Sequence, residues 1–301
     1  MNRSYLIKPF HSSMRLDRWL RNNIGKFPQS LIEKSLRKGK IKINKKKTTS
    51  SYKLKAGDTV DFFNFVFKKN ILLKKEKYIP TKKNLIENEQ TIIENNENFI
   101  VINKKAGIAS QGGTKSKKNI IDLFSNSKYF LDSKPYSVHR LDKDTSGVMI
   151  IAKNHNFARL LTTLFRLRKI HKTYLAICHG SFKNKKGELK DELIRYDNKK
   201  KIIEVARSTY RVINDNGLFT LVELKPITGR KHQLRKQLLI IGNPIVGDDK
   251  YSLKNKIDKT YKNLMLHAYK LKFFINNQKF FFKAELPSYF KEYLKKKRLI
   301  I

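Results

Sequence analysis

From about residue 92 onward, the sequence is dominated by short apolar runs that are separated by polar turns. Four of these runs have the length and the branched or aromatic content of buried strands, and they lie at residues 100–102, 148–151, 174–177 and 219–222. Helix-like segments fall between them, at about 154–168 and 230–241. Because strands dominate, the pattern predicts an α+β domain built on a mixed, mostly antiparallel sheet.

A smaller basic module precedes this region, at residues 15–62. Apolar residues recur at helical spacing over 16–20 with arginines between them, and a second helix is expected after Pro28. Gly39 stands where a helix-ending residue in the left-handed region is expected, and short alternating strands follow it. The predicted order is helix, helix, strand, turn, strand.

Between the two patterns, residues 64–90 are rich in Lys and Asn and show little periodicity, apart from a short strand expected around 71–73. We therefore predict a small binding domain over 1–75, a linker over 76–90 and a larger domain over 91–301.

Composition limits the partners and the compartment. Lys and Arg total 67 against 25 Asp and Glu, which gives a formal net charge of +42. Such a charge favours a polyanionic partner, and nucleic acid is the leading candidate, although drift toward Lys in an AT-rich coding sequence is an alternative source of part of it. Cys178 is the one cysteine, there is no apolar run of membrane-spanning length, and residues 1–10 lack the apolar core of a secretory signal. We expect a cytoplasmic protein without a membrane partner.

The sharpest chemical signal is the polar segment HRLDKDTSG at residues 139–147, which leads into the buried run 148–152. It holds two carboxylates, Asp142 and Asp144, with cations beside them that favour the ionised form a nucleophile needs. On these residues alone the two aspartates are equal candidates. A turn stabilised by Asp and Ser side chains is the structural alternative.

This segment is similar to the HRLDxxTSG signature of the RluA family of pseudouridine synthases. The resemblance implies that Asp142 is the catalytic residue, whereas Asp144 falls on a variable position of the motif. Arg140, within the same signature, is expected to bind the substrate. Residues 172–176, KTYLA, resemble the family's KxYxA element, which implies that Tyr174 lies against the target base.

Two further segments match in order along the chain. Residues 228–235 resemble the TGRxHQxR element, which implies that Arg235 pairs with the catalytic carboxylate, in a geometry that a guanidinium can make bidentate. Thr228 or Gly229 is expected to open the helix that carries Arg235, and His232 is read as structural rather than as a general base. Residues 264–268 resemble the LxLHA element, which implies that Leu266 lines the base pocket.

The basic module resembles the S4 RNA-binding domain. The residues that carry this resemblance are 15–17, 19–20, 35–39, 43–44 and 55–58. It implies that Arg15, Arg18, Arg37 and Lys38 contact the phosphates of a structured RNA, which positions a protein without reading sequence.

Together the resemblances imply isomerisation of specific uridines to pseudouridine in 23S ribosomal RNA. The domain order and the Gly-Gly segment at 112–113 are most similar to the RluC subgroup, and the RluD subgroup is the nearest alternative. We expect a monomer that needs no cofactor and no metal, since there is no metal-like cluster, P-loop or dinucleotide fingerprint. Two alternatives from other classes are a non-catalytic RNA-binding protein of ribosome assembly and a glycoside hydrolase using Asp142 and Asp144.

Overall fold

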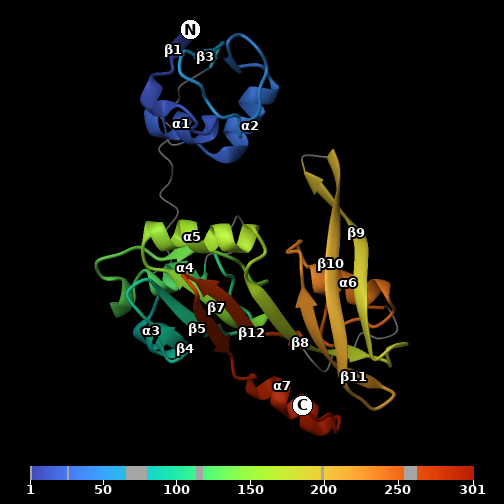
Figure 1. The fold of residues 1–301 in the computed structure, drawn as a ribbon. Coiled ribbons are helices and arrows are strands. Elements are labelled where there is room, and N and C mark those ends of the chain that lie inside the picture. Colours follow the sequence, from blue (N-terminus) through green and yellow to red (C-terminus); the bar gives the residue numbers. More distant parts are fainter. Residues whose placement is uncertain (1, 26, 66–79, 113–117, 198–199, 254–262) are drawn as a thin grey trace. The chain divides into compact units, whose positions relative to one another are not determined.

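The computed structural model describes residues 2–25, 27–65, 80–112, 118–197, 200–253 and 263–301. The chain divides into two compact units, Met1–Glu76 and Lys77–Ile301, each of which is visible in Figure 1. The strand expected around 71–73 lies outside the described residues.

The first unit packs two helices against a small sheet. Its elements are β1 (Arg3–Leu6), a 3-10 turn (Pro9–His11), α1 (Leu16–Asn23), α2 (Gln29–Arg37), β2 (Ile41–Ile43) and β3 (Thr59–Phe62). The predicted order of elements is confirmed, with Pro28 at the start of α2 and Gly39 at a φ of +68° after its end. The sequence did not predict β1, which completes an antiparallel sheet of order β1-β3-β2.

The second unit is built on one large sheet. Its helices are α3 (Lys82–Glu89), α4 (Ile120–Phe124), a 3-10 turn (Lys128–Phe130), α5 (His155–Arg166), α6 (Gln233–Ile240) and α7 (Ser288–Lys296). Its strands are β4 (Ile92–Asn95), β5 (Phe99–Lys104), β6 (Tyr136–Ser137), β7 (Ser146–Ala152), β8 (His171–His179), β9 (Lys186–Asp197), β10 (Lys200–Asp215), β11 (Phe219–Pro226), β12 (Leu266–Ile275) and β13 (Gln278–Lys283).

The sheet is mixed and mostly antiparallel, as predicted. Its order is β4-β5-β7-β12-β8-β11-β10-β9, with β13 on β12 and β6 on β7. The pairing of β12 with β7 is parallel, and the other pairings between the named strands of this sheet are antiparallel. The four apolar runs predicted as strands lie in β5, β7, β8 and β11.

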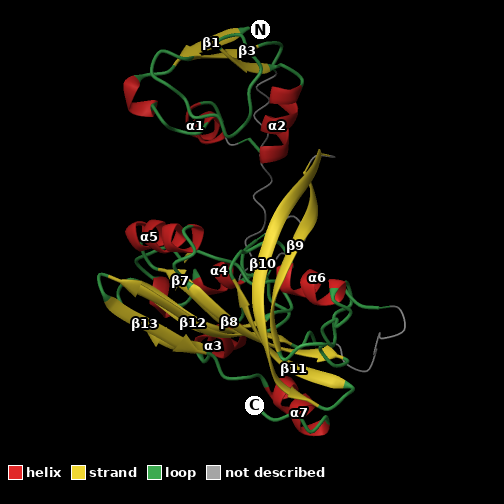
Figure 2. Ribbon diagram, turned by 45° about the vertical axis from the view of Figure 1, so that its right-hand side comes forward, coloured by secondary structure: helices red, strands yellow, loops and turns green. Residues whose placement is uncertain are grey.

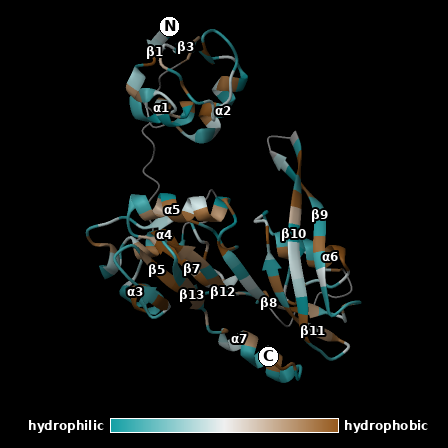
Figure 3. Cartoon of the chain, in the orientation of Figure 1, coloured by the Kyte–Doolittle hydropathy of each residue, from teal (hydrophilic) through white to brown (hydrophobic). Residues whose placement is uncertain are grey.

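Alternate residues of the central strands enter different cores. Val148 and Ile150 of β7 pack with Leu161 of α5, while Met149 and Ile151 pack with Phe124 of α4. Helices therefore cover both faces of β7, which explains why this strand reads as a continuous apolar run and is coloured brown in Figure 3. Figure 2 shows α6 and α7 beside the other half of the sheet. No helix in the described part of the chain is long and apolar enough to cross a membrane.

Two segments differ from the sequence-based expectation. Helix α3 occupies much of the stretch expected to be a linker, and its first turn is capped by Thr81, whose hydroxyl accepts from the Asn84 backbone. The helix has no apolar stripe, so periodicity could not reveal it. The long hairpin of β9 and β10 was also missed, because charged residues interrupt its apolar positions.

Candidate active site

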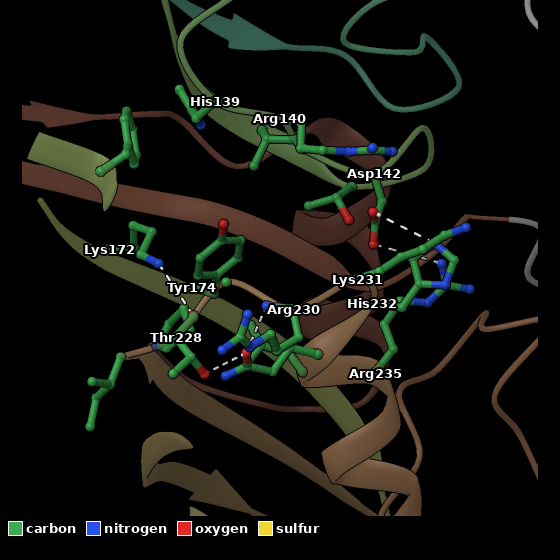
Figure 4. Close-up of a pocket in the computed structure, with 18 of the residues that line it drawn as sticks. His139, Arg140, Asp142, Lys172, Tyr174, Thr228, Arg230, Lys231, His232 and Arg235 are labelled. Atoms are coloured by element: carbon green, nitrogen blue, oxygen red, sulfur yellow. Dashed lines mark hydrogen bonds and ion pairs between the residues drawn. The ribbon is translucent and has the colours of Figure 1, made fainter. Parts of the chain in front are cut away.

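An open pocket of about 670 Å³ lies where the loop before β7, strand β8 and the start of α6 meet. Five site residues that the family resemblance implied line this pocket: Arg140, Asp142, Tyr174, Arg235 and Leu266. Figure 4 labels the first four of them. Asp144 is not among the lining residues. The two aspartates that the sequence left equal are thus distinguished by position.

The side chain of Ser110 holds the backbone of the loop that carries Asp142. The Ser110 hydroxyl donates to the Leu141 carbonyl at 2.6 Å and accepts from the Leu141 N–H at 2.9 Å. The loop leads into β7, whose second residue, Gly147, has a φ of +113°. A Cβ at Gly147 would lie 2.2 Å from the Ala268 carbonyl oxygen, so only glycine allows β7 and β12 to approach this closely.

His139, at the start of the same loop, is a structural residue. Its Nε2 accepts from the Ile150 N–H at 2.9 Å, and its ring stacks on Phe165 at a centroid distance of 4.5 Å. Burial lowers the pKa of His139 to about 3, and the nearby Lys172 contributes to the fall. The imidazole is therefore neutral and acts as an acceptor that joins the loop to β7.

A buried lysine lies under the loop that carries Asp142, and the sequence did not reveal it. Lys104 is 0% exposed, and its Nζ donates to the carbonyls of Lys105, Ile108 and Lys143 at 2.9, 2.9 and 3.1 Å. Burial lowers its pKa to about 7, and the charges of Asp144 and Asp142 oppose that fall. The sequence places Lys104 in an NKKAG segment, but nothing local indicates that its ammonium faces inward.

Asp142 lies between two cationic or potentially cationic side chains from α6 and its N-terminus. Its Oδ2 is 4.0 Å from Nη1 of Arg235, and its Oδ1 is 3.7 Å from Nε2 of His232; dashed lines mark both in Figure 4. The side chain of Asp142 is 20% exposed, so the carboxylate can be reached from the pocket. A carboxylate in this setting can act as a nucleophile or as a base.

Arg235 makes its closest contacts elsewhere, which corrects the expected geometry. Its Nε and Nη2 donate to the two carboxylate oxygens of Asp248, both at 2.6 Å. Asp248 is fully buried and also accepts from the backbone N–H groups of Lys250 and Tyr251. The bidentate partner of Arg235 is therefore Asp248, which holds the guanidinium so that its remaining nitrogen, Nη1, faces Asp142.

The start of α6 also differs from the expectation. His232 is the N-cap residue, with a left-handed φ of +54°, so the helix begins at Gln233 and not at Thr228 or Gly229. The His232 Nδ1 is 2.9 Å from the Tyr251 hydroxyl, and the Tyr251 ring lies 5.1 Å from the Arg235 guanidinium. Burial lowers the pKa of His232, the charges of Arg235, Lys250 and Lys231 add to the effect, and Asp142 opposes it.

Thr228 and Gln233 hold the segment before α6 against β10. The Thr228 hydroxyl accepts from the Arg207 N–H at 2.8 Å and lies 2.7 Å from Oε1 of Gln233. Gln233 in turn donates to the Arg207 carbonyl and to the Ser208 hydroxyl. Thr228 and Gln233 of the TGRxHQxR element therefore hold the chain before α6 in place, while Arg235 of the same element faces the pocket.

Tyr174 and Lys172 line the pocket from β8. Burial raises the pKa of the Tyr174 hydroxyl, and the charge of Asp142 raises it further, so the phenol stays neutral and offers an aromatic face. The Lys172 ammonium is 3.4 Å from the Thr228 carbonyl, and burial lowers its pKa to about 8. Leu266, 3% exposed, adds an apolar wall.

In the first unit, the four candidate RNA contacts differ in availability. Arg15 binds the buried Asp17 through two nitrogens, at 3.1 and 2.8 Å, and this hydrogen bonding lowers the pKa of Asp17. Arg18, Arg37 and Lys38 are exposed on α1 and at the end of α2. The latter three remain the candidates for phosphate contacts, whereas Arg15 has a structural partner.

Comparisons with known proteins agree with this geometry. The RNA pseudouridylate synthase family matches residues 98–239, and the S4 domain matches residues 14–60. The ribosomal large subunit pseudouridine synthase C of Rickettsia conorii is 36% identical over 298 residues, covering 92% of this chain and 95% of the relative. The chain belongs to the RNA pseudouridylate synthase family. The enzyme of the same name from Buchnera aphidicola subsp. Schizaphis graminum is 34% identical over 94% of this chain and 93% of its own.

A solved structure also shares the synthase fold. Human RNA pseudouridylate synthase domain containing 4 aligns with a TM-score of 0.64 and 28% identity, covering 72% of this chain and 96% of that chain. The predicted RluA-family membership, with an S4 domain before the synthase domain, is confirmed by these matches.

The buried Lys104 gives the synthase a testable pH dependence of stability. In the unfolded chain Lys104 keeps its proton up to about pH 10.5, whereas the folded protein releases it near pH 7. Between these values the unfolded state binds more protons, so stability rises with pH. Urea unfolding should show wild type gaining about 2 kcal/mol over Lys104→Met from pH 7 to 9. A difference that is flat over this range would contradict the assignment.

Proposed function

We propose that this pseudouridine synthase isomerises specific uridines in 23S ribosomal RNA of the large subunit, with Asp142, Tyr174 and Arg235 as the catalytic residues. The observation that carries the proposal is the carboxylate of Asp142 facing Arg235 in a pocket shared with Tyr174. The assignment of the substrate rests on relatives named ribosomal large subunit pseudouridine synthase C, which are 36% and 34% identical over most of the chain. Since that substrate belongs to ribosomes, we also propose a cytoplasmic location; the monomer stays a prediction from the sequence.

Isomerisation needs the target nucleotide inside the pocket. A base within a helix cannot reach Asp142, so the nucleotide is flipped out, at a cost of a few kcal/mol. Stacking on Tyr174 offsets about 1–3 kcal/mol of that cost, and Leu266 supplies an apolar surface for the ring. Arg140, exposed beside the pocket, is placed to contact the RNA backbone next to the flipped nucleotide.

The reaction requires neither redox chemistry nor an external group. The bond between N1 and C1′ breaks, the uracil turns, a bond between C5 and C1′ forms, and C5 loses a proton while N1 gains one. Asp142 acts on the bound nucleotide as nucleophile or base, and Arg235 places a positive charge beside its carboxylate. Addition at C1′, addition at the uracil ring and a glycal route all use this same carboxylate.

The alternatives are less well supported. A glycoside hydrolase needs two carboxylates flanking one bond, and Asp144 is not among the residues that line the pocket. A non-catalytic assembly protein would have no need of an aspartate, a tyrosine and an arginine gathered in one pocket. The RluD-type assignment is disfavoured because the relatives named above carry the name of synthase C.

Mapping pseudouridines in ribosomal RNA tests the proposal directly. Large-subunit RNA from cells with and without the gene is treated with a carbodiimide and read by primer extension. We expect discrete stops that vanish without the gene and return with the wild-type copy but not with Asp142→Asn. An identical pattern of stops in all strains would refute the assignment to large-subunit RNA.

The exposed cations of the first unit should anchor the RNA without affecting the chemistry. The triple substitution Arg18→Gln, Arg37→Gln, Lys38→Gln is expected to reduce the salt dependence of RNA affinity by roughly 2–3 in log–log slope, since each lost phosphate contact removes roughly 0.7–0.9. Filter binding at several salt concentrations measures this. At saturating RNA the turnover rate should match wild type; an unchanged slope would show that these residues do not contact phosphates.

A further inference from the structure

The hairpin of β12 and β13 carries lysines and phenylalanines along one face. The two strands pair so that Phe274 is opposite Lys279, Lys272 is opposite Phe281 and Lys270 is opposite Lys283. Opposite residues of an antiparallel pair share a face, and residues two apart along a strand do too. These six residues form what we call the lysine–phenylalanine face: Lys270, Lys272, Phe274, Lys279, Phe281 and Lys283.

The opposite face of the same hairpin is anchored in the protein core. Leu271, Phe273 and Phe282 are 2%, 0% and 8% exposed and pack in the cluster that includes Leu161 of α5. Phe273 and Phe280 stack at a centroid distance of 5.1 Å. The hairpin is therefore held firmly, and the orientation of the lysine–phenylalanine face is fixed by packing on its other side.

Both phenylalanines of the lysine–phenylalanine face are exposed to solvent. Phe274 is 48% exposed and Phe281 is 50% exposed. They occupy diagonal positions across the two strands, offset by two residues in the pairing. A single exposed phenylalanine needs no explanation, but two diagonal neighbours on a rigid sheet form an aromatic platform.

The charge of this face is positive. Among the described ion pairs, none involves its four lysines; Lys272 lies over the Phe274 ring, with Nζ 5.5 Å from the ring centroid. Glu285, two residues beyond Lys283, is 3.4 Å from Lys291, and its charge also acts on Lys283, whose pKa is raised chiefly by a hydrogen bond with Tyr269. Lys270 and Lys283 lie over the Tyr269 ring, with Nζ 5.0 and 5.3 Å from its centroid, so within the described part of the chain four lysines face a single acidic neighbour. Lysines interleaved with exposed aromatic rings match the phosphates and bases of a single strand.

We propose that the lysine–phenylalanine face binds a single-stranded segment of the RNA substrate apart from the uridine that is modified. The inference rests on the proposed function, because it takes RNA as the polyanion. Leu271 pairs with Lys172, which lines the active-site pocket, so the pocket and this face belong to opposite sides of the strands at that point. Exposed aromatic residues on sheet surfaces stack RNA bases, and lysines beside them neutralise phosphates.

Binding of a fluorescent 20-residue oligouridine and kinetics on a full-length large-subunit RNA transcript test the inference together. In Phe274→Ala/Phe281→Ala, loss of base stacking should weaken oligouridine binding and raise KM for the transcript, each about tenfold or more, with kcat unchanged. The matched control Leu131→Ala/Leu218→Ala removes two apolar side chains, 79% and 74% exposed, from outside the face and should behave as wild type.

The lysines are tested by Lys272→Gln/Lys279→Gln/Lys283→Gln, which should reduce the salt slope of oligouridine binding by about 2. Lys82→Gln/Lys83→Gln, exposed on α3, controls for loss of net charge and should reduce it less. Wild-type KM and oligouridine affinity in the phenylalanine variant, with pseudouridine still formed, would overturn the inference. If the wild-type protein forms no pseudouridine, the proposed function fails instead, and the oligouridine measurement still judges the face.

Discussion

Replacement of Asp142 by asparagine should reduce pseudouridine formation by about 10⁴-fold or more, because asparagine keeps the shape of the side chain but cannot act as nucleophile or base. The Asp142 oxygens lie 4.0 Å from Nη1 of Arg235 and 3.7 Å from Nε2 of His232. An asparagine side chain fits the same space, so the fold should tolerate the substitution. Tritium release from uridine C5 in transcribed RNA measures the loss. RNA affinity, measured by filter binding, should stay within a few fold of wild type.

Asp144→Asn is the matched control, since it removes a carboxylate two residues away that is not among the pocket-lining residues. Its activity should stay within about tenfold of wild type, and its main effect should be on Lys104, whose charge Asp144 stabilises. Full activity in Asp142→Asn, or an equal loss in both variants, would reject the assignment of Asp142.

Local sequence patterns predicted the parts of the fold that depend on one strand or one helix. The apolar run at 148–151 could be recognised as a strand because it forms the middle of β7, which is covered on both faces. A strand that is buried on both faces has a continuous apolar sequence. Gly39 ends α2 in the left-handed conformation that its position suggested. The S4 and synthase assignments were predictable because several short motifs occur in the right order.

The missing parts depend on contacts between distant segments. Asp248 follows Arg235 by thirteen residues, and only the fold shows that its buried carboxylate takes the guanidinium fork that the sequence assigned to Asp142. Lys104 is one of many lysines in the chain, and its burial under the loop that carries Asp142 has no local signature. Hairpin β9–β10 pairs over twelve residue positions with an alternation broken by charged residues, so periodicity could not identify it.

Arg235→Met should affect both stability and activity, because Arg235 binds the buried Asp248 and also faces Asp142, with the exposed Asp249 as a third carboxylate at 3.7 Å. Its removal leaves the fully buried Asp248 without a cation, and breaking a buried pair in this way costs about 3–5 kcal/mol. It also removes the cation that faces Asp142, which we expect to reduce turnover by about 10³-fold. Urea unfolding and tritium release, measured on the same preparations, give the two quantities separately.

The double variant Arg235→Met/Asp248→Asn separates the two roles. An asparagine in place of Asp248 would carry no charge to bury, and its side-chain oxygen can still accept from the backbone N–H groups of Lys250 and Tyr251, so most of the lost stability should return. Activity should remain low, since nothing in this variant replaces the guanidinium beside Asp142. Arg235→Lys supplies a charge without the planar fork and should fall between wild type and Arg235→Met in both measurements. If activity returned along with stability in the double variant, Arg235 would be a structural residue that holds Asp248, with no part in the reaction at Asp142.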